Sequence, residues 1–270
     1  MKAFVWMFAF NICAGIAAAA ELHPIVEVQS GYLFGASSGG NWVKADEASK
    51  SLTDGAIYRV YGLTQSLGDA KGGKASAEDA PCEQTFSVSL SPKPDNGVLA
   101  IAAPWNALPR KVQLLDPTQK VYVDAVRDFL KTKGIAEPKV KIGNIIRVDL
   151  DGDGEEEVLI STTNYFTKDD SVPMRSPAGS YSAVILRRVV NGKVETQLVE
   201  GEFFPKAYSS SDQSSFNAPN AYKVVAVLDL DGDGKMEIIV GSRYYEGEAT
   251  TIYRCDPKKI EAVLDVGCGA

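Results

Sequence analysis

Two nearly identical stretches decide the fold of this chain: DLDGDGEEE at residues 149–157 and DLDGDGKME at residues 229–237. Apolar runs rich in Val and Ile precede and follow each of them. Carboxylates packed this densely repel one another, and a like-charge pair about 4 Å apart costs on the order of 4 kcal/mol at an effective dielectric of about 20. A bound divalent cation reverses that cost, and Ca²⁺ takes about six to eight oxygen ligands. The two stretches therefore predict two calcium-binding loops.

The spacing within each loop argues against an EF-hand. An EF-hand opens with the same Asp pattern but needs a bidentate Glu at position 12, where this chain has Ile160 and Val240. The fourth carboxylate stands at position 9 instead, as the chain enters the next strand. A hairpin loop folded over a cation would use side chains from positions 1, 3, 5 and 9 and the backbone carbonyl of position 7. The expected metal ligands are Asp149, Asp151, Asp153, Glu155 (carbonyl) and Glu157, and Asp229, Asp231, Asp233, Lys235 (carbonyl) and Glu237.

An alternative is a pair of acidic, glycine-rich turns without metal, because Asp and Gly are ordinary turn residues. The recurrence of the same four carboxylates at the same spacing, between matching strands, favours the metal-binding interpretation.

Strand candidates recur around the two loops, whose first residues, Asp149 and Asp229, are 80 positions apart. Each loop joins two candidates and is followed by two more, with Asn191-Gly192 marking a tight hairpin turn. Residues 136–270 are therefore expected to form two repeats of four strands each. The candidates are Val140–Leu150, Glu157–Asn164, Tyr181–Val190, Lys193–Val199, Tyr222–Leu230, Glu237–Ser242, Ala249–Arg254 and Ile260–Val266.

Residues 21–135 lack the Asp motif but show similar short apolar segments, and an N-terminal β region is expected there. Gly68–Ala80 is rich in small and charged residues and is interpreted as a linker or loop. The strand candidates are Ile25–Val28, Gly31–Phe34, Ile57–Leu63, Gln84–Leu90 and Val98–Ala102.

One accessory helix is predicted at about residues 117–133. Asp116 is its expected N-cap, Gln119 would complete a capping box, and Gly134 would end it. Its apolar face is expected to pack against a sheet, and consists of Tyr122, Val126, Phe129 and Leu130.

The pattern Asp-x-Asp-Gly-Asp-Gly-x-x-Glu between apolar strands resembles the Ca²⁺ loop of FG-GAP/VCBS-type repeats, which occur in integrin α-subunit propellers and many secreted bacterial proteins. The resemblance covers the surroundings of each loop and, more loosely, Val140–Val266. It implies a mainly β fold with propeller-like four-stranded repeats. Because a closed propeller needs at least about four blades, residues 21–135 would have to supply degenerate blades, and the sequence leaves closure of the ring open.

Residues 1–20 have the features of a secretory signal peptide: Lys2, an apolar run over Ala3–Ile16, and the small residues Ala17–Ala20 before the expected cleavage point. We expect secretion to the periplasm or the extracellular space. No other segment is long and apolar enough to span a bilayer, so no membrane insertion is expected after cleavage. The net charge of −7, without a basic stripe, argues against a nucleic-acid partner.

Three cysteines remain beyond the signal segment: Cys82, Cys255 and Cys268. In an oxidising compartment, the simplest expectation is a Cys255–Cys268 bridge, because it would join two successive strand candidates. Sequence alone leaves the pairing open.

No catalytic residue is assigned. Ser37 within GASSG fits the spacing of a hydrolase nucleophile elbow, but the single histidine, His23, lies upstream of it, and a surface turn is the simpler interpretation. Acidic residues outside the loops, Glu200 and Glu202 among them, are interpreted as solvated loop charges. The chain is therefore expected to be a non-enzymatic module that binds a protein or a carbohydrate and carries structural Ca²⁺. The alternative is a secreted, carboxylate-dependent hydrolase, for instance a carbohydrate-active one, with structural Ca²⁺.

Overall fold

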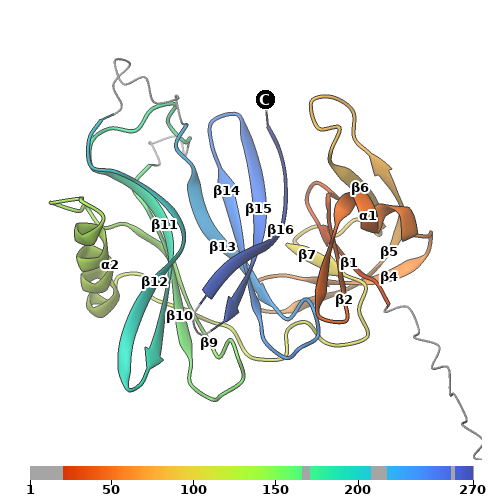
Figure 1. The fold of residues 1–270 in the computed structure, drawn as a ribbon, viewed down its shortest axis with the longest axis horizontal. Coiled ribbons are helices and arrows are strands. Elements are labelled where there is room, and N and C mark those ends of the chain that lie inside the picture. The colour runs from red at the N-terminus through yellow and green to blue at the C-terminus, as the bar shows by residue number, and fades with distance from the viewer. Residues whose placement is uncertain (1–20, 166–170, 208–217, 257–258, 270) are drawn as a thin grey trace, which may run out of the picture.

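The computed structural model describes residues 21–165, 171–207, 218–256 and 259–269. Within them the chain forms three antiparallel sheets and two short α-helices. Figure 1 shows the sheets side by side, with a four-stranded sheet (sheet C) between a five-stranded sheet (sheet B) and a seven-stranded one (sheet A). The predicted signal peptide lies outside the described residues. The fold is mainly β, as expected.

Sheet C is buried on both faces. One face, with Val224 and Ile238, packs on sheet B, and the other, with Ala226 and Ile239, packs on sheet A. A strand covered on both sides has no polar face, which explains the unbroken apolar run before the second Asp loop. The sheet is an up-and-down meander of β13 (Ala221–Leu228), β14 (Glu237–Arg243), β15 (Gly247–Asp256) and β16 (Lys259–Gly269).

Sheet B contains the same meander around the first Asp loop, so both predicted four-stranded units are present. A short additional strand, β8, extends it along β9. The turn at Asn191-Gly192 joins β11 to β12 with positive φ at both residues, as that sequence requires. The strands are β8 (Gln113–Leu115), β9 (Ile142–Val148), β10 (Glu157–Thr163), β11 (Ser180–Val190) and β12 (Lys193–Phe204).

Sheet A rolls into a half-barrel around its own apolar core. Its last strand, β6, returns toward the start of β2, where Tyr32 and Ser87 form an isolated bridge. Leu33, Tyr58 and Val60 belong to the core inside the roll. The strands are β1 (His23–Glu27), β2 (Leu33–Ser38), β3 (Asn41–Lys44), β4 (Ala56–Tyr61), β5 (Ser66–Ala77), β6 (Phe86–Ser91) and β7 (Leu99–Ile101).

The interpretation of Gly68–Ala80 as a linker was wrong, because most of it lies in β5, which pairs with β4 and β6. Small residues suit this strand for a steric reason. A Cβ at Gly72 would come 2.3 Å from the ring of Tyr58, so the strand can cross the buried ring only without a side chain there.

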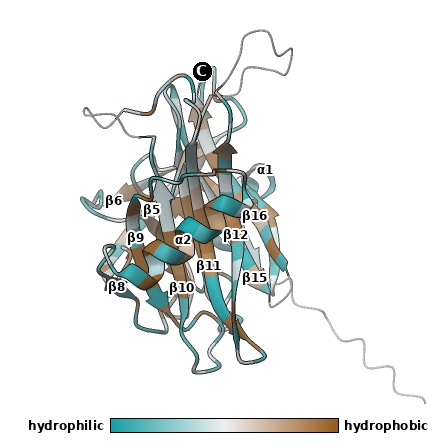
Figure 2. Ribbon diagram, turned by 90° about the vertical axis from the view of Figure 1, so that its left-hand side faces the viewer, coloured by the Kyte–Doolittle hydropathy of each residue, from teal (hydrophilic) through white to brown (hydrophobic). Residues whose placement is uncertain are grey.

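The predicted accessory helix is α2 (Lys120–Thr132), with Val126 and Leu130 buried against sheet B. Figure 2 shows it lying across the strands of that sheet. Its end at Gly134, with φ +84°, is as expected. Its start was placed too early, and the expected capping box does not form: Asp116 instead accepts hydrogen bonds from Thr118 within the preceding turn. A second helix, α1 (Ala45–Ala48), continues into a 3₁₀ turn, Ser49–Ser51, and was not predicted.

No closed propeller forms among the described residues. In a ring, each sheet would need another sheet on both faces, whereas here α2 covers the outer face of sheet B and the rolled core fills the outer side of sheet A. The result is an open stack of three sheets with covered ends, as terminal units of repeat proteins require.

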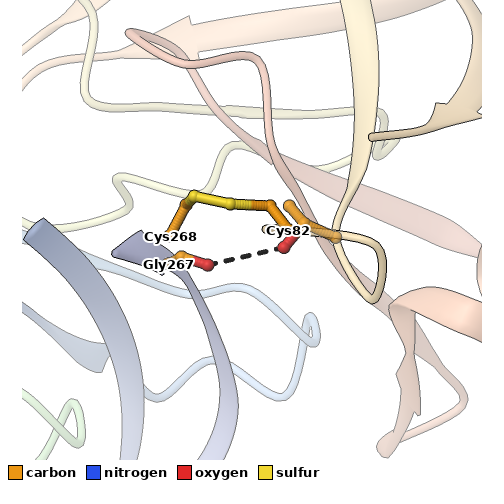
Figure 3. Close-up of a disulfide and its surroundings, with 4 residues drawn as sticks. Cys82, Gly267 and Cys268 are labelled. Atoms are coloured by element: carbon orange, nitrogen blue, oxygen red, sulfur yellow. Dashed lines mark hydrogen bonds between the residues drawn. A yellow bond between two sulfur atoms is a disulfide. The ribbon is translucent and has the colours of Figure 1, made fainter. Parts of the chain in front are cut away.

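The expected Cys255–Cys268 bridge was wrong: Cys268 pairs with Cys82, and Cys255 is a free thiol. Strand register explains the difference. Cys255 lies opposite Ile260 and Cys268 lies opposite Glu248, so the two cysteines stand at opposite ends of the β15–β16 hairpin. The bridge joins sheet C to the loop before β6, where Thr85 Oγ1 also donates to Gly267 O at 3.4 Å (Figure 3).

Polar side chains satisfy the open edge of β13 and link sheets B and C. Ser161 and Ser182 of sheet B accept hydrogen bonds from the backbone N–H groups of Val224 and Tyr222 at 2.9 and 2.8 Å. Such pairing protects an edge strand. Two further links are carboxylates that were expected to be solvated loop charges. Glu200 accepts from the hydroxyl of Tyr253 at 2.5 Å, and Glu202 accepts from that of Tyr222 at 3.1 Å.

Candidate metal centres in two matched hairpin loops

Both Asp loops are hairpin tips at the same end of the stack, the lower end in Figure 1. Strand pairing continues up to position 9 of each loop, counted from Asp149 and Asp229. Glu157 pairs with Val148, and Glu237 pairs with Leu228. The eight residues between the paired positions must turn within a short span. Glycines at positions 4 and 6 allow this, with φ between +78° and +93° in the two loops.

The same hydrogen bonds shape the two loops. The carboxylate at position 1 accepts from the N–H groups at positions 4 and 6, at 2.7 and 3.2 Å in the first loop and 2.8 and 3.2 Å in the second. The carboxylates at positions 3 and 5 each accept from the N–H two residues on. The carboxylate at position 9 reaches back to the N–H at position 2, at 2.8 Å in both loops. Each carboxylate is thereby held by the backbone of its own loop.

This folding brings three carboxylates together in each loop, with one oxygen of each within 4.8 Å of the others. In the first loop they are Asp149, Asp151 and Asp153, at positions 1, 3 and 5. In the second they are Asp229, Asp231 and Glu237, at positions 1, 3 and 9. The remaining predicted side-chain ligands, Glu157 and Asp233, are fixed by the backbone bonds described above. The carbonyls of Glu155 and Lys235 stay predictions as ligands.

Burial makes the second cluster electrostatically costly. Asp229 and Glu237 are only 4% and 1% exposed. Loss of hydration raises the pKa of Glu237 to about 9, and the neighbouring Asp charges contribute to the rise. Burial likewise raises the pKa of Asp229, of Asp231 and, in the first loop, of Glu157.

The charge of Arg254 lowers the pKa of Asp231, but burial has the larger effect and the net shift is upward. Among the residues that the structure describes, none of the ion pairs involves a carboxylate at position 1, 3, 5 or 9, and the nearby Arg254 pairs with Asp256 and Glu261. Buried carboxylates that converge without an ion-pair partner fit a hard divalent cation, and an all-oxygen donor set suits Ca²⁺ or Mg²⁺.

The connector between β7 and β8 supports both loops at equivalent points, which no motif in the sequence indicated. Trp105 donates its indole N–H to the carbonyl of Asp229 at 2.9 Å, and its ring covers Gly232. Arg110 donates Nε–H to the carbonyl of Asp149 at 2.5 Å, and its guanidinium covers Gly152. The position 1 carbonyl therefore has an aromatic partner in one loop and a cationic partner in the other.

Ser37 is part of the support for the second loop and not a nucleophile. It is fully buried in β2, and its Oγ donates to the carbonyl of Leu230 at 2.7 Å. The Ser37 hydroxyl is buried, so it is not accessible to a substrate, and it donates its hydrogen bond to a backbone carbonyl and not to a general base. The expectation of a surface turn there was wrong, because Ser37 lies within a strand.

A cleft of about 760 Å³ lies away from the Asp loops, where the other ends of the three sheets meet. Its lining combines both signs of charge with tyrosines, and includes Glu27, Tyr32, Tyr222, Lys223, Arg243 and Glu248. Glu27 accepts hydrogen bonds from the N–H groups of Gln29 and Ser30 and from the Ser30 hydroxyl, which hold it in its own turn.

The aromatic pairs after the two loops differ. Tyr165 is buried and packs against Phe204, whereas Phe166 lies outside the described residues. Tyr244 and Tyr245 are partly exposed and contact each other edge to face.

Comparison with known proteins gives one family match. No curated protein and no solved structure matches the chain. Residues 221–253 match the FG-GAP repeat, a segment that begins with β13, contains the whole second Asp loop and β14, and ends within β15. The chain therefore contains an FG-GAP repeat, built around the loop whose carboxylates are the more deeply buried.

Proposed function

We propose that this is a secreted calcium-binding β-repeat protein in which Ca²⁺ at the two Asp loops is structural and the folded stack acts as a non-enzymatic interaction module. The observation that carries the proposal is the convergence of Asp229, Asp231 and Glu237 in a largely buried cluster that forms no ion pair with any residue the structure describes. An FG-GAP repeat at the same residues supports calcium as the cation.

The residues that would hold the ion are those of the matched loops. In the second loop, three Asp side chains, Glu237 and the carbonyl of Lys235 supply oxygen. The first loop would use Asp149, Asp151, Asp153, Glu157 and the carbonyl of Glu155. The ion would neutralise carboxylates that otherwise repel one another, so its contribution is to the stability of the hairpin tips.

The partner is proposed to be a protein or a carbohydrate bound away from the metal loops. The cleft between the sheets supports this, because tyrosines, hydroxyl groups and charges of both signs suit polar recognition.

Secretion is supported by the Cys82–Cys268 bridge, since disulfides persist in oxidising compartments. No helix in the described part of the chain is long and apolar enough to cross a membrane.

Thermal unfolding tests the calcium proposal. A ligand at about 100 times its Kd stabilises by about 2.7 kcal/mol, and each kcal/mol moves the Tm of a protein this size by about 2–4 °C. Millimolar Ca²⁺ should therefore raise the Tm by at least about 5–10 °C over chelator, and Asp151→Asn with Asp231→Asn should abolish the rise. An identical wild-type Tm in chelator and in Ca²⁺ would overturn the proposal.

A glycan array and a protein pull-down, each with Ca²⁺ and with chelator, test the interaction role. Binding should weaken with Lys223→Glu in the cleft and persist with Lys193→Glu at the β11–β12 turn. Turnover of a glycan that is lost on Glu248→Gln would indicate the hydrolase instead.

A further inference from the structure

One arginine holds the two Asp loops together. Nη2 of Arg110 donates to the carbonyl of Leu150 at 2.8 Å and to that of Gly234 at 2.7 Å, in addition to the Nε bond to Asp149. A single guanidinium thus bonds positions 1 and 2 of the first loop and position 6 of the second. Its planar fork and permanent charge suit several fixed carbonyls at once.

A direct bond reinforces this contact. The N–H of Met236 donates to the carbonyl of Leu150 at 2.8 Å. Gly234 and Met236 flank Lys235, whose carbonyl is the proposed backbone ligand of the second loop. The orientation of that carbonyl is therefore fixed from both sides by groups that depend on the geometry of the first loop.

We propose that Arg110 is a positioning residue that couples the two cation sites, so that Ca²⁺ in either loop raises the affinity of the other. This rests on the proposed function, because it requires both loops to bind the ion. An occupied first loop holds the carbonyls of Asp149 and Leu150 in place, and Arg110 transmits that order to Gly234 beside the ligand carbonyl. By thermodynamic linkage the effect is equal in both directions.

Electrostatics acts in the opposite sense. Filling one loop removes part of its negative charge and so weakens the pull on a second cation. This effect is screened beyond about 8 Å at physiological ionic strength, whereas the hydrogen-bonded link does not depend on salt. Measurement at about 0.15 M salt therefore favours detection of the structural coupling.

The experiment is calorimetric titration of the full chain with Ca²⁺. The first-loop affinity in Asp231→Asn, where the second loop stays empty, is compared with the wild-type first-loop affinity when the second loop is filled. The affinity should fall at least about fivefold in the variant, the lower end of ordinary couplings. The reciprocal variant, Asp151→Asn, should lower second-loop affinity by the same factor.

Arg110→Lys, which keeps the charge but cannot reach all three carbonyls, should reduce that factor by half or more. Arg188→Lys is the matched control, because Arg188 also bonds a backbone carbonyl across sheets B and C, and that carbonyl, of Asp256, lies outside both loops. If Arg110→Lys does not fold, Arg110→Gln takes its place.

The outcomes separate the two proposals. Absence of any wild-type Ca²⁺ binding overturns the proposed function itself. If the Ca²⁺ affinity of each site stays the same or rises when the other site is removed, the coupling is overturned. A coupling factor that is unchanged in Arg110→Lys overturns the role of Arg110.

Discussion

The first and second Asp loops share a motif, a turn geometry and a set of hydrogen bonds, and differ in what surrounds them. In the first loop, Asp151 and Asp153 are exposed and a charged guanidinium lies over Gly152. In the second, Asp229 and Glu237 are buried and an indole ring lies over Gly232. The second loop belongs to the middle sheet of the stack, and its strands carry the FG-GAP match.

The difference in burial predicts that the two loops bind a cation with unequal strength. Where the carboxylates are buried, they repel one another strongly in a loop without a cation, because charges interact strongly in a low dielectric. A bound cation would remove much of that repulsion. Where they are exposed, water already solvates the charges and the cation has less to relieve. The second loop should therefore be the tighter site and the larger contributor to stability.

The largest expected effect compares Asp231→Asn with Asp151→Asn in millimolar Ca²⁺. Asp231→Asn should lower the Tm by about 5–10 °C, by the linkage arithmetic for losing a saturating ligand, and Asp151→Asn by less than half as much. In chelator the Asp231→Asn protein should be at least as stable as wild type, because a repelling charge has been removed. Equal losses for the two variants would contradict the ranking of the loops.

The next effect concerns the covered glycines. Gly232→Ala and Gly152→Ala both force a left-handed conformation, at about 1–2 kcal/mol. A Cβ at position 232 would also lie 3.2 Å from three atoms of the Trp105 ring, whereas at 152 it meets a single atom this closely, Nη1 of Arg110 at 3.1 Å. Denaturant titration should therefore show the larger loss for Gly232→Ala. Gly234→Ala, with open space around it, measures the backbone strain alone and should match the smaller value.

A smaller effect is expected from Trp105→Phe, which keeps a ring but removes the donor to Asp229. One hydrogen bond of this kind is worth about 1 kcal/mol, so the Tm in Ca²⁺ should fall by about 2–4 °C. Trp105 should also report Ca²⁺ binding by a change in fluorescence that disappears in this variant and persists in Trp42→Phe. A Ca²⁺-dependent signal that survives Trp105→Phe would show that the ring is not coupled to the site.

The smallest effect is predicted for the most visible sequence difference, Glu155 against Lys235 at position 7. That position is proposed to supply its carbonyl, and the Lys235 side chain forms only a partly exposed ion pair with Asp256, worth about 0–1 kcal/mol. Exchanging the two residues should change Ca²⁺ affinity by less than the factor of about ten that corresponds to 1.4 kcal/mol. A larger change would place the side chain, and not the carbonyl, at the ion.

The sequence was sufficient to predict the elements that depend on local interactions. The Asp loops, their flanking strands, the Asn191-Gly192 turn and the apolar face of α2 each depend on residues close together in the chain. The predictions failed where contacts between residues far apart in the chain determine the structure. Ser66–Ala77 is a strand because it pairs with β4 and β6, where Gly72 leaves room for the ring of Tyr58. Cys82 pairs with Cys268 across 186 positions, and the hairpin register separates Cys268 from Cys255.

The supporting residues of the site were missed for the same reason. Trp105, Arg110 and Ser37 touch the loops through backbone carbonyls, which have no sequence signature. Their roles arise from the connector and β2 reaching the tips of neighbouring sheets. The Asp motif also could not predict whether the sheets close into a ring, since this depends on α2 and the half-barrel, which cover the ends of the stack.

Those covered ends restrict how such a molecule can grow by duplication. An extra copy of the unit from β13 to β16 has faces that fit only other sheets, and neither end of this stack offers one. A longer relative could arise by inserting new units beside sheet C, with the helix and the half-barrel carried outward unchanged. The two ends would then remain the recognisable parts of the architecture while the number of Asp loops varied between them.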